Sequence, residues 1–280
     1  MPSLKDIKNS IASVKATQKI TKAMKMISTA RLTKSKIILQ NHKEYSNAIN
    51  EIAKSTISHF NNDTLDIPKF LENFTVKVQN AETLTVLIST DKGLCGALNT
   101  FLFKEFQANV LKTDNIIVIG KKAFDYAKNK VKILNSTPYF AGKVENHQKI
   151  IADILNIVKE KNIGKIKIIF PEFISVMVQK PKTLIFPEKI KNLGSPPQFV
   201  VEGCQIMLTT KIIEEAISSL IQQGISQMMC SEHSARMIAM DNASNNASTR
   251  IKALTLAYNK TRQANITREI LEIVAGSQAI

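Results

Sequence analysis

The sequence predicts an α/β protein: a long antiparallel coiled coil of the N- and C-terminal helices with an inserted Rossmann-like α/β domain. The first observation behind this prediction is the position of Gly and Pro. Residues 3–67 contain neither, residues 204–280 contain only Gly224 and Gly276, and seven Gly and seven Pro lie in between. Because Gly and Pro most often interrupt regular structure, two long helices should flank a domain that is rich in turns.

The N-terminal helix is expected over about residues 4–59. Its first apolar side chains are three or four residues apart, a spacing typical of a coiled coil: Leu4, Ile7, Ile11 and Val14. We expect this apolar face to loosen afterwards and to continue through Ile20, Ala23, Met24, Ile27 and Ala30. A helix of about 80 Å cannot cover such a face alone, so it should pack against the C-terminal helix.

The middle of the chain alternates between strand and helix patterns. A β-branched run at residues 84–90 predicts a buried strand, which is followed by a turn and then by a helix from Ala97 to about Leu111. The remaining expected elements are a strand at 116–119, helices at 121–129 and 147–161, and strands at 165–170 and 183–186. Strands that alternate with helices indicate a mostly parallel, doubly wound sheet.

The C-terminal helix is expected from about Gln205 to Val274. Residues 206–225 are apolar nearly all round, so this part should lie inside the globular domain. A spaced apolar row follows, and we expect it to extend to the end of the helix: Ala247, Ile251, Leu254, Tyr258, Ile266, Ile270 and Ile273. The expected division is therefore 1–60 for the first helix, 61–204 for the central domain and 205–280 for the last helix.

Charge and composition limit the function classes. The net charge is +15, and residues 1–60 carry 11 Lys or Arg against 3 Asp or Glu. Lys15, Lys19, Lys22 and Lys25 are spaced to share one helix face, which is either a solvated face or a contact for an acidic partner. The three Cys show no paired spacing, which argues for a reducing compartment. The absence of an apolar leader favours a bacterial cytoplasmic protein, and no apolar run is long enough for a membrane helix.

The turn after the first strand is the one place where a nucleotide site could be considered. Gly93 and Gly96 stand between a strand and a helix, as in a dinucleotide-binding loop, but the phosphate-binding glycine motifs are missing. We interpret Gly93, Cys95 and Gly96 as a structural turn. Cys95 has no sequence-identified base beside it, so a small buried thiol is the better interpretation. No catalytic residue, metal ligand or cofactor site is expected.

Three separated segments resemble one known family. They are IASVKATQKITKAMKM at residues 11–26, DKGLCGALN at residues 91–99, and YNKTRQANITREILEIVAG at residues 258–276. Together they resemble the head, central-turn and C-terminal signatures of the gamma subunit of the F-type ATP synthase. The resemblance runs from end to end of the chain.

The resemblance implies a rotor shaft inside a hexamer of alpha and beta subunits. Its foot would meet the epsilon subunit and the ring of membrane c subunits, on the cytoplasmic face of the bacterial inner membrane. The nucleotides and the chemistry would belong to beta, and no nucleic acid would bind. By resemblance, the neck facing acidic segments of beta comprises Lys15, Lys19, Lys22, Met24 and Lys25. Arg262 and Gln263 match a contact to a beta loop, and the bearing tip comprises Ile270, Leu271, Ile273, Val274 and Ile280.

Two other function classes remain open on sequence alone. A basic coiled-coil protein could bind nucleic acid or an anionic membrane surface, although the head helix lacks the aromatic residues that usually accompany such binding. A Rossmann-type enzyme with coiled-coil appendages would need a nucleotide site in the central domain. Nucleotide binding by the isolated chain, and binding to a salt-graded DNA column, would discriminate these classes.

Overall fold

The computed structural model describes residues 3–60, 82–110, 115–142, 146–161, 163–187 and 205–278. Within these, the side chains of residues 57–60, 205, 276 and 278 are left undescribed. The chain divides into two compact units. Unit 1 contains residues 1–29 and 236–280, and unit 2 contains residues 30–235.

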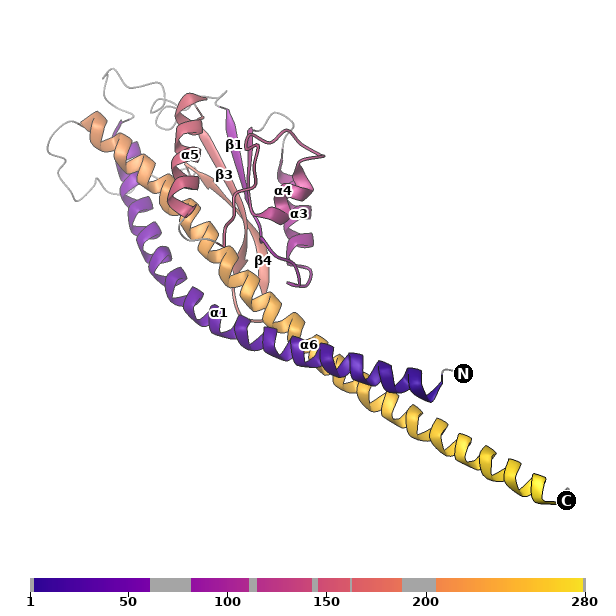
Figure 1. Cartoon of the computed structure of the whole chain (residues 1–280). Helices are drawn as coiled ribbons and strands as arrows, with labels where there is room; N and C mark the ends of the chain where they lie inside the picture. Colours follow the sequence, from indigo (N-terminus) through magenta and orange to yellow (C-terminus); the bar gives the residue numbers. More distant parts are fainter. Residues whose placement is uncertain are drawn as a thin grey trace. The chain divides into compact units, whose positions relative to one another are not determined.

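Two long helices confirm the main prediction. Helix α1 spans Leu4–Phe60 and helix α6 spans Gln205–Gln278, with 57 and 74 residues respectively, and each helix contributes to both units (Figure 1). Helix α1 begins where it does because Ser3 caps it. The Asp6 amide donates to Ser3 Oγ at 3.2 Å, and the Ser3 amide donates back to Asp6 Oδ2 at 3.1 Å. This reciprocal pair satisfies amides that a helix start leaves without partners.

The sheet of unit 2 has four strands in the order β2-β1-β3-β4. They are β1 (Thr83–Ile88), β2 (Asn115–Ile119), β3 (Lys165–Phe173) and β4 (Gln179–Phe186). Strand β1 pairs in parallel with β2 and β3, and β4 pairs antiparallel with β3. Only a few residues join β3 to β4, which permits a hairpin but not the crossover that a parallel pair requires. The sheet is therefore mostly parallel, as predicted, with one antiparallel edge.

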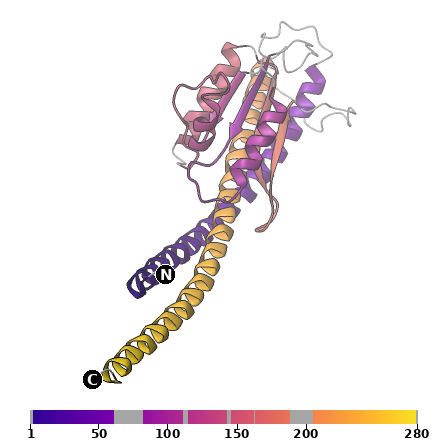
Figure 2. The same cartoon turned by 90° about the vertical axis from the view of Figure 1, so that its right-hand side faces the viewer.

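Helices cover both faces of the sheet, as expected for a doubly wound domain (Figures 1 and 2). Helices α3 (Leu98–Asn109) and α4 (Lys121–Ala127) lie on one face, while α5 (His147–Glu160) and α6 lie on the other. Successive strand residues point to opposite faces. Thus Val86 and Ile88 of β1 join the core under α5 and α6, whereas Leu87 joins the core under α3 and α4.

The first part of α6 crosses the sheet at close range, which confirms that it lies inside the globular domain. Ile213, Ile217 and Ile221 are buried. A Cβ added at Gly224 would lie only 2.8 Å from Ile88 Cδ1. Gly224 therefore allows α6 to approach the sheet closely, because it places no side chain between the helix and Ile88.

In unit 2, α1 packs along α6 through polar contacts as well as apolar ones. The Tyr45 hydroxyl donates to Glu215 Oε1 at 2.8 Å, and the Ser46 hydroxyl donates to Gln223 Oε1 at 3.2 Å. The hydrogen bond to Glu215, together with partial burial, raises the pKa of the Tyr45 hydroxyl. These pairs join the second half of α1 to the first half of α6.

In unit 1, α1 and α6 form an antiparallel pair. Lys25 Nζ donates to Asp241 Oδ1 at 2.7 Å, which fixes the alignment of the two helices. Leu4, the first residue of α1, lies 21 residues before Lys25. Because the two helices run antiparallel, the residue of α6 opposite Leu4 should lie 21 residues after Asp241, at Arg262. The paired part of α6 should therefore end near Arg262.

The buried face of α1 in unit 1 differs from the prediction. Its buried or half-buried side chains keep the three-and-four spacing throughout: Leu4, Ile7, Ile11, Val14, Gln18, Thr21, Lys25 and Ser28, with Met24 beside Lys25. Ile20 and Ile27 are 61% and 54% exposed, so placing them on the packed face was wrong. Ile20 follows Gln18 by two residues, which is roughly 200° around the helix. The buried Thr21 hydroxyl donates to the Gln18 carbonyl at 3.0 Å, so it packs without an unsatisfied polar group.

The buried face of α6 ends where the alignment of the pair says it should. From Met240 onward the buried or half-buried row is Met240, Ser244, Ala247, Ile251, Leu254, Tyr258 and Thr261. The predicted continuation was wrong, because Ile266, Ile270 and Ile273 are 45%, 54% and 72% exposed. Helix α1 has no residues left to cover them, and α6 continues past the N-terminus (Figure 1).

None of the helices formed by the described residues combines the length and the apolar character that crossing a bilayer requires.

Candidate functional site

The predicted neck lysines fall into two groups. Lys15, Lys19 and Lys22 are exposed on α1, each one residue beyond a position of the packed row. They form one stripe of positive charge beside the α1–α6 pair. Such a stripe is available for an acidic surface, although individual exposed ion pairs contribute only about 0.2–1 kcal/mol.

Lys25 is separated from this stripe. It lies on the packed row and makes the ion pair with Asp241, and the two side chains are 41% and 43% exposed. Asp241 was not identified from the sequence as a partner of Lys25, although it is the only acidic residue between His233 and Arg268. Met24 lies half-buried beside Lys25. The charge of Lys25 therefore stabilises the helix pair itself.

Arg262 and Gln263 lie where α6 leaves its pairing with α1. Both are exposed, and the last half-buried residue of the row is Thr261, immediately before them. A guanidinium and an amide at this place present strong hydrogen-bond donors. Their position therefore suits contact with another chain rather than with α1.

The predicted bearing tip is an exposed apolar helix end. Ile270, Leu271, Ile273 and Val274 are 54%, 62%, 72% and 47% exposed, while Ile280 lies outside the described residues. Large apolar side chains gathered on one exposed segment are typical of a surface that another protein covers.

The central turn is held by its own side chains. Leu94 and Gly96 have φ of 63° and 60°, and Gly93 has only the Lys122 side chain near its Cβ position. Cys95 is buried at 3% exposure. Asn99 Nδ2 donates to Thr90 Oγ1 at 2.8 Å and to Cys95 Sγ at 3.5 Å, which ties the turn to the end of β1.

The groups that could hold a phosphate at this edge of the sheet already have partners. In doubly wound folds a ligand binds at the carboxyl ends of the strands. Here the amide of Lys121, the first residue of α4, donates to Asp91 Oδ1, and the Ala123 amide donates to Ser89 Oγ at 2.9 Å. Asp91 Oδ2 also accepts from the Gly142 amide at 2.7 Å. A carboxylate therefore occupies the place where an anionic ligand would need donors.

We therefore expect the purified chain to bind ATP with magnesium no more tightly than millimolar and to hydrolyse none. Calorimetric titration of the full chain is the measurement, with the Asp91→Asn variant as a control for the blocking carboxylate. Micromolar binding by the wild-type chain would contradict this interpretation of the turn.

The buried thiols give no sign of a nucleophile. Burial raises the pKa of the Cys230 thiol to about 11, which keeps it protonated near neutral pH. In the part of the chain that the structure describes, no three His, Cys, Asp or Glu side chains gather in a group that could hold a metal ion.

The fold and the exposed surfaces define a class of protein whose terminal helices pair antiparallel and leave one helix end uncovered, and whose chain carries a doubly wound domain between these helices in sequence. The family model described as ATP synthase matches residues 3–280. The chain is 34% identical to the ATP synthase gamma chain of Glaesserella parasuis serovar 5 (strain SH0165), with all of both chains covered. It is also 34% identical to the gamma chain of Buchnera aphidicola subsp. Acyrthosiphon pisum (strain Tuc7), covering all of this chain and 99% of the other.

The chain belongs to the ATP synthase gamma chain family. Solved structures show the same fold. A chain of the mitochondrial ATP synthase of Euglena gracilis (OSCP/F1/c-ring, rotational state 3) matches with a TM-score of 0.67 at 18% identity, covering 99% of this chain and 94% of that one. A chain of the central stalk/c-ring of the Tetrahymena thermophila enzyme matches with a TM-score of 0.58 at 19% identity, covering 80% and 99%.

Proposed function

We propose that this chain is the central rotor shaft of a proton-translocating F-type ATP synthase. It would transmit torque between the ring of c subunits and the hexamer of alpha and beta subunits. The observation that carries this proposal is the end of α6, where Arg262 and the exposed apolar residues that follow extend beyond the helix pair. Exposed apolar side chains gathered on one helix end mark a surface that another protein covers, and most helical stability in proteins comes from such packing.

The mechanical role also suits the construction of the paired helices. Sharp bends in helices usually occur at Pro or Gly pairs, and α1 contains neither residue from Leu4 to Phe60. Ion pairing of Lys25 with Asp241 further joins α1 to α6. A stiff pair of this kind can carry torque, whereas the hydrolytic chemistry would belong to the beta subunits and this chain would be non-catalytic.

The remaining parts of the proposal concern place and partners. The segments 1–60 and 205–280 would form the shaft, and 61–204 would form a foot that meets the epsilon subunit and the c-ring. The chain would be peripheral, on the cytoplasmic face of the bacterial inner membrane. The family membership and the absence of a membrane-spanning helix among the described residues support this placement.

The lysine stripe provides the test of the shaft proposal. Changing Lys15, Lys19 and Lys22 to Gln keeps helix propensity but removes three exposed charges without touching Lys25. We expect this variant to bind the alpha–beta hexamer more weakly than the wild type. Its affinity should also fall less steeply as salt rises, because salt screens exposed charges, with a Debye length of about 8 Å at physiological ionic strength, and the variant has three fewer of them. The measurement is binding of the full chain to the purified hexamer across a salt series.

A matched variant controls for the change in net charge. Lys104, Lys121 and Lys128 are also exposed but lie in unit 2, so their replacement by Gln should leave the affinity and its salt dependence close to those of the wild type. If the stripe variant and this control behave alike, the stripe is only a solvated face and does not contact the hexamer.

A further inference from the structure

The β3–β4 hairpin extends past the end of β1 and contacts α6. Strand β1 pairs with β3 over Lys165–Ile169, whereas β3 itself continues to Phe173. The tip of the hairpin, residues 174–178, joins β3 to β4. The large apolar side chains of this tip are exposed, with Ile174, Met177 and Val178 at 55%, 74% and 40%. Burial of these side chains therefore does not hold the tip in place.

The last part of β3 directs backbone groups towards α6. Pro171 lies opposite Pro181 of β4, and neither has an amide hydrogen, so this pair cannot be a hydrogen-bonded one. Because hydrogen-bonded and non-hydrogen-bonded pairs alternate along an antiparallel ladder, Pro171 and Phe173 direct their backbone groups away from β4. Side chains of α6 bind these groups. The Ser231 hydroxyl donates to the Pro171 carbonyl at 2.9 Å, and the Phe173 amide donates to Gln227 Oε1 at 2.9 Å.

A third residue of α6 holds the tip of the hairpin. The Ser234 hydroxyl donates to the Val176 carbonyl at 2.6 Å and accepts from Gln179 Nε2 at 3.3 Å. Gln227, Ser231 and Ser234 are four and three residues apart, so they share one face of α6. All three side chains are buried, so water does not compete for their hydrogen bonds.

The acceptors of the two serines distinguish them from other serines of α6. Serine hydroxyls inside a helix commonly donate to a carbonyl of the preceding turn. Ser219 and Ser226 are also buried, and their hydroxyls donate within α6 at 2.9 Å. Ser231 and Ser234 donate to the hairpin instead. Their hydroxyls therefore join the helix to the sheet.

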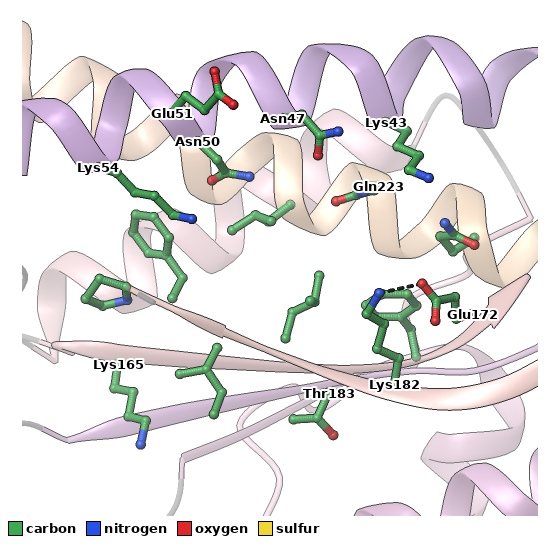
Figure 3. A pocket seen from close by; sticks show the side chains of 17 residues that line it. Lys43, Asn47, Asn50, Glu51, Lys54, Lys165, Glu172, Lys182, Thr183 and Gln223 are labelled. Atoms are coloured by element: carbon green, nitrogen blue, oxygen red, sulfur yellow. Dashed lines mark hydrogen bonds and ion pairs between the residues drawn. The ribbon is translucent and has the colours of Figure 1, made fainter. Parts of the chain in front are cut away.

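The hairpin also contacts α1, and an ion pair joins its two strands. Lys36 Nζ lies 5.4 Å from the centre of the Phe173 ring, which is within the range of cation–π attraction. Lys182 of β4 pairs with Glu172 of β3 beside a groove that α1 and α6 also line (Figure 3). Within unit 2 the hairpin is therefore linked to both long helices.

The hydrogen bonds to the hairpin oppose rotation of α6 about its own axis. A hydrogen bond weakens steeply as its alignment is lost, whereas hydrophobic stabilisation is non-directional. A turn of α6 would move the hydroxyls of Ser231 and Ser234 away from their acceptors. The bonds lie where α6 reaches the end of unit 2, at Ala235, so they fix the orientation of the helix at that point.

We propose that the β3–β4 hairpin is a clamp that passes torque from the central domain to α6, with Gln227, Ser231 and Ser234 as its positioning residues. This proposal rests on the proposed function, because it requires that the chain turns as a shaft. The clamp carries torque only when the shaft works between the c-ring and the hexamer. It therefore matters for ATP synthesis by the whole complex, and not for hydrolysis by a complex without the c-ring.

Removing two hydroxyls of the clamp tests the proposal. Changing Ser231 and Ser234 to Ala suits a helix but removes both donors to the hairpin carbonyls. Hydrogen exchange at the Phe173 and Ser175 amides of the full chain should become about tenfold faster. In vesicles that hold the whole synthase, ATP synthesis driven by a proton gradient should fall about threefold or more, because two buried hydrogen bonds are lost. Hydrolysis by the soluble alpha–beta–gamma complex should stay at the wild-type rate.

Changing Ser219 and Ser226 to Ala is the matched control, because these hydroxyls are also buried on α6 but donate within the helix. The control variant should keep the exchange rates and the synthesis rate of the wild type. If the double clamp variant does not enter the complex, Ser234→Ala alone is compared with Ser226→Ala in the same two assays.

The two assays separate a clamp from a merely structural role. Faster exchange at the hairpin, with a ratio of synthesis to hydrolysis equal to that of the control, would overturn the inference while leaving the proposed function intact. An equal loss of synthesis in the clamp and control variants would do the same. A wild-type chain that does not turn inside the hexamer would instead overturn both.

Discussion

Replacing Gly120 by alanine is expected to lower the free energy of unfolding by about 3 kcal/mol or more. Gly120 follows β2 with φ of 99°, and a Cβ there would lie 2.2 Å from the Ser89 carbonyl oxygen. That oxygen is backbone, so it cannot move aside as the end of a side chain could. The Gly120 amide also donates to the Tyr139 carbonyl at 2.7 Å, which joins the end of β2 to the Tyr139 segment.

Gly96→Ala is the matched control for this prediction. Gly96 also has a positive φ, of 60°, but no atom lies within 4 Å of its Cβ position. Only the conformational strain remains, which is about 1 kcal/mol. Urea unfolding of both purified variants compares the two costs, and equal destabilisation would show that the close approach to Ser89 does not control the effect.

The second large effect is expected at Arg262 and Gln263. Changing both to Ala should leave the complex assembled but lower its steady-state ATP hydrolysis, because each desolvated donor contributes about 1–3 kcal/mol in the rotational state in which it is used. The structure supports the choice of these residues, since both are exposed directly after the last half-buried residue of the helix pair, Thr261.

Asn259 and Lys260 provide the control for that prediction. They are also exposed but lie about one turn earlier, where α6 is still paired with α1. Their replacement by Ala should change turnover little. Unchanged turnover in the Arg262 and Gln263 variant would mean that both side chains are merely solvated.

The two long helices could be predicted because Gly and Pro are missing from them, and the capping pair of Ser3 and Asp6 begins α1 at the expected place. The packed face of α1 could be predicted only as far as Val14. Beyond it the row continues through Gln18, Thr21 and Ser28, which an inspection of apolar residues overlooks. Counting the heptad onward from Leu4 would have found them, since small hydroxyl side chains also pack between helices.

Other features depend on contacts that no local pattern contains. Lys25 shares its spacing with the exposed lysines, and only the alignment of α1 with α6 shows that it pairs with Asp241. Similarly, Ile270 and Ile273 continue the apolar spacing of α6 but have no partner helix, because α1 begins at Leu4. The backbone of β4 is a further example. The amide and carbonyl of Thr183 point away from β3 because Pro171 lies opposite Pro181, and this can be known only from the β3–β4 register.

Direct observation of rotation tests the central claim most sharply. With the alpha–beta hexamer fixed to a surface, a particle can be attached to a cysteine at Phe101, which is 54% exposed on α3. Cys95 and Cys230 are buried, and Cys204 can be replaced by Ser. During ATP hydrolysis the particle should rotate persistently in one direction and should stop when the nucleotide is removed. Hydrolysis at the full rate with a stationary particle would contradict the account, because the chain would then not be the shaft.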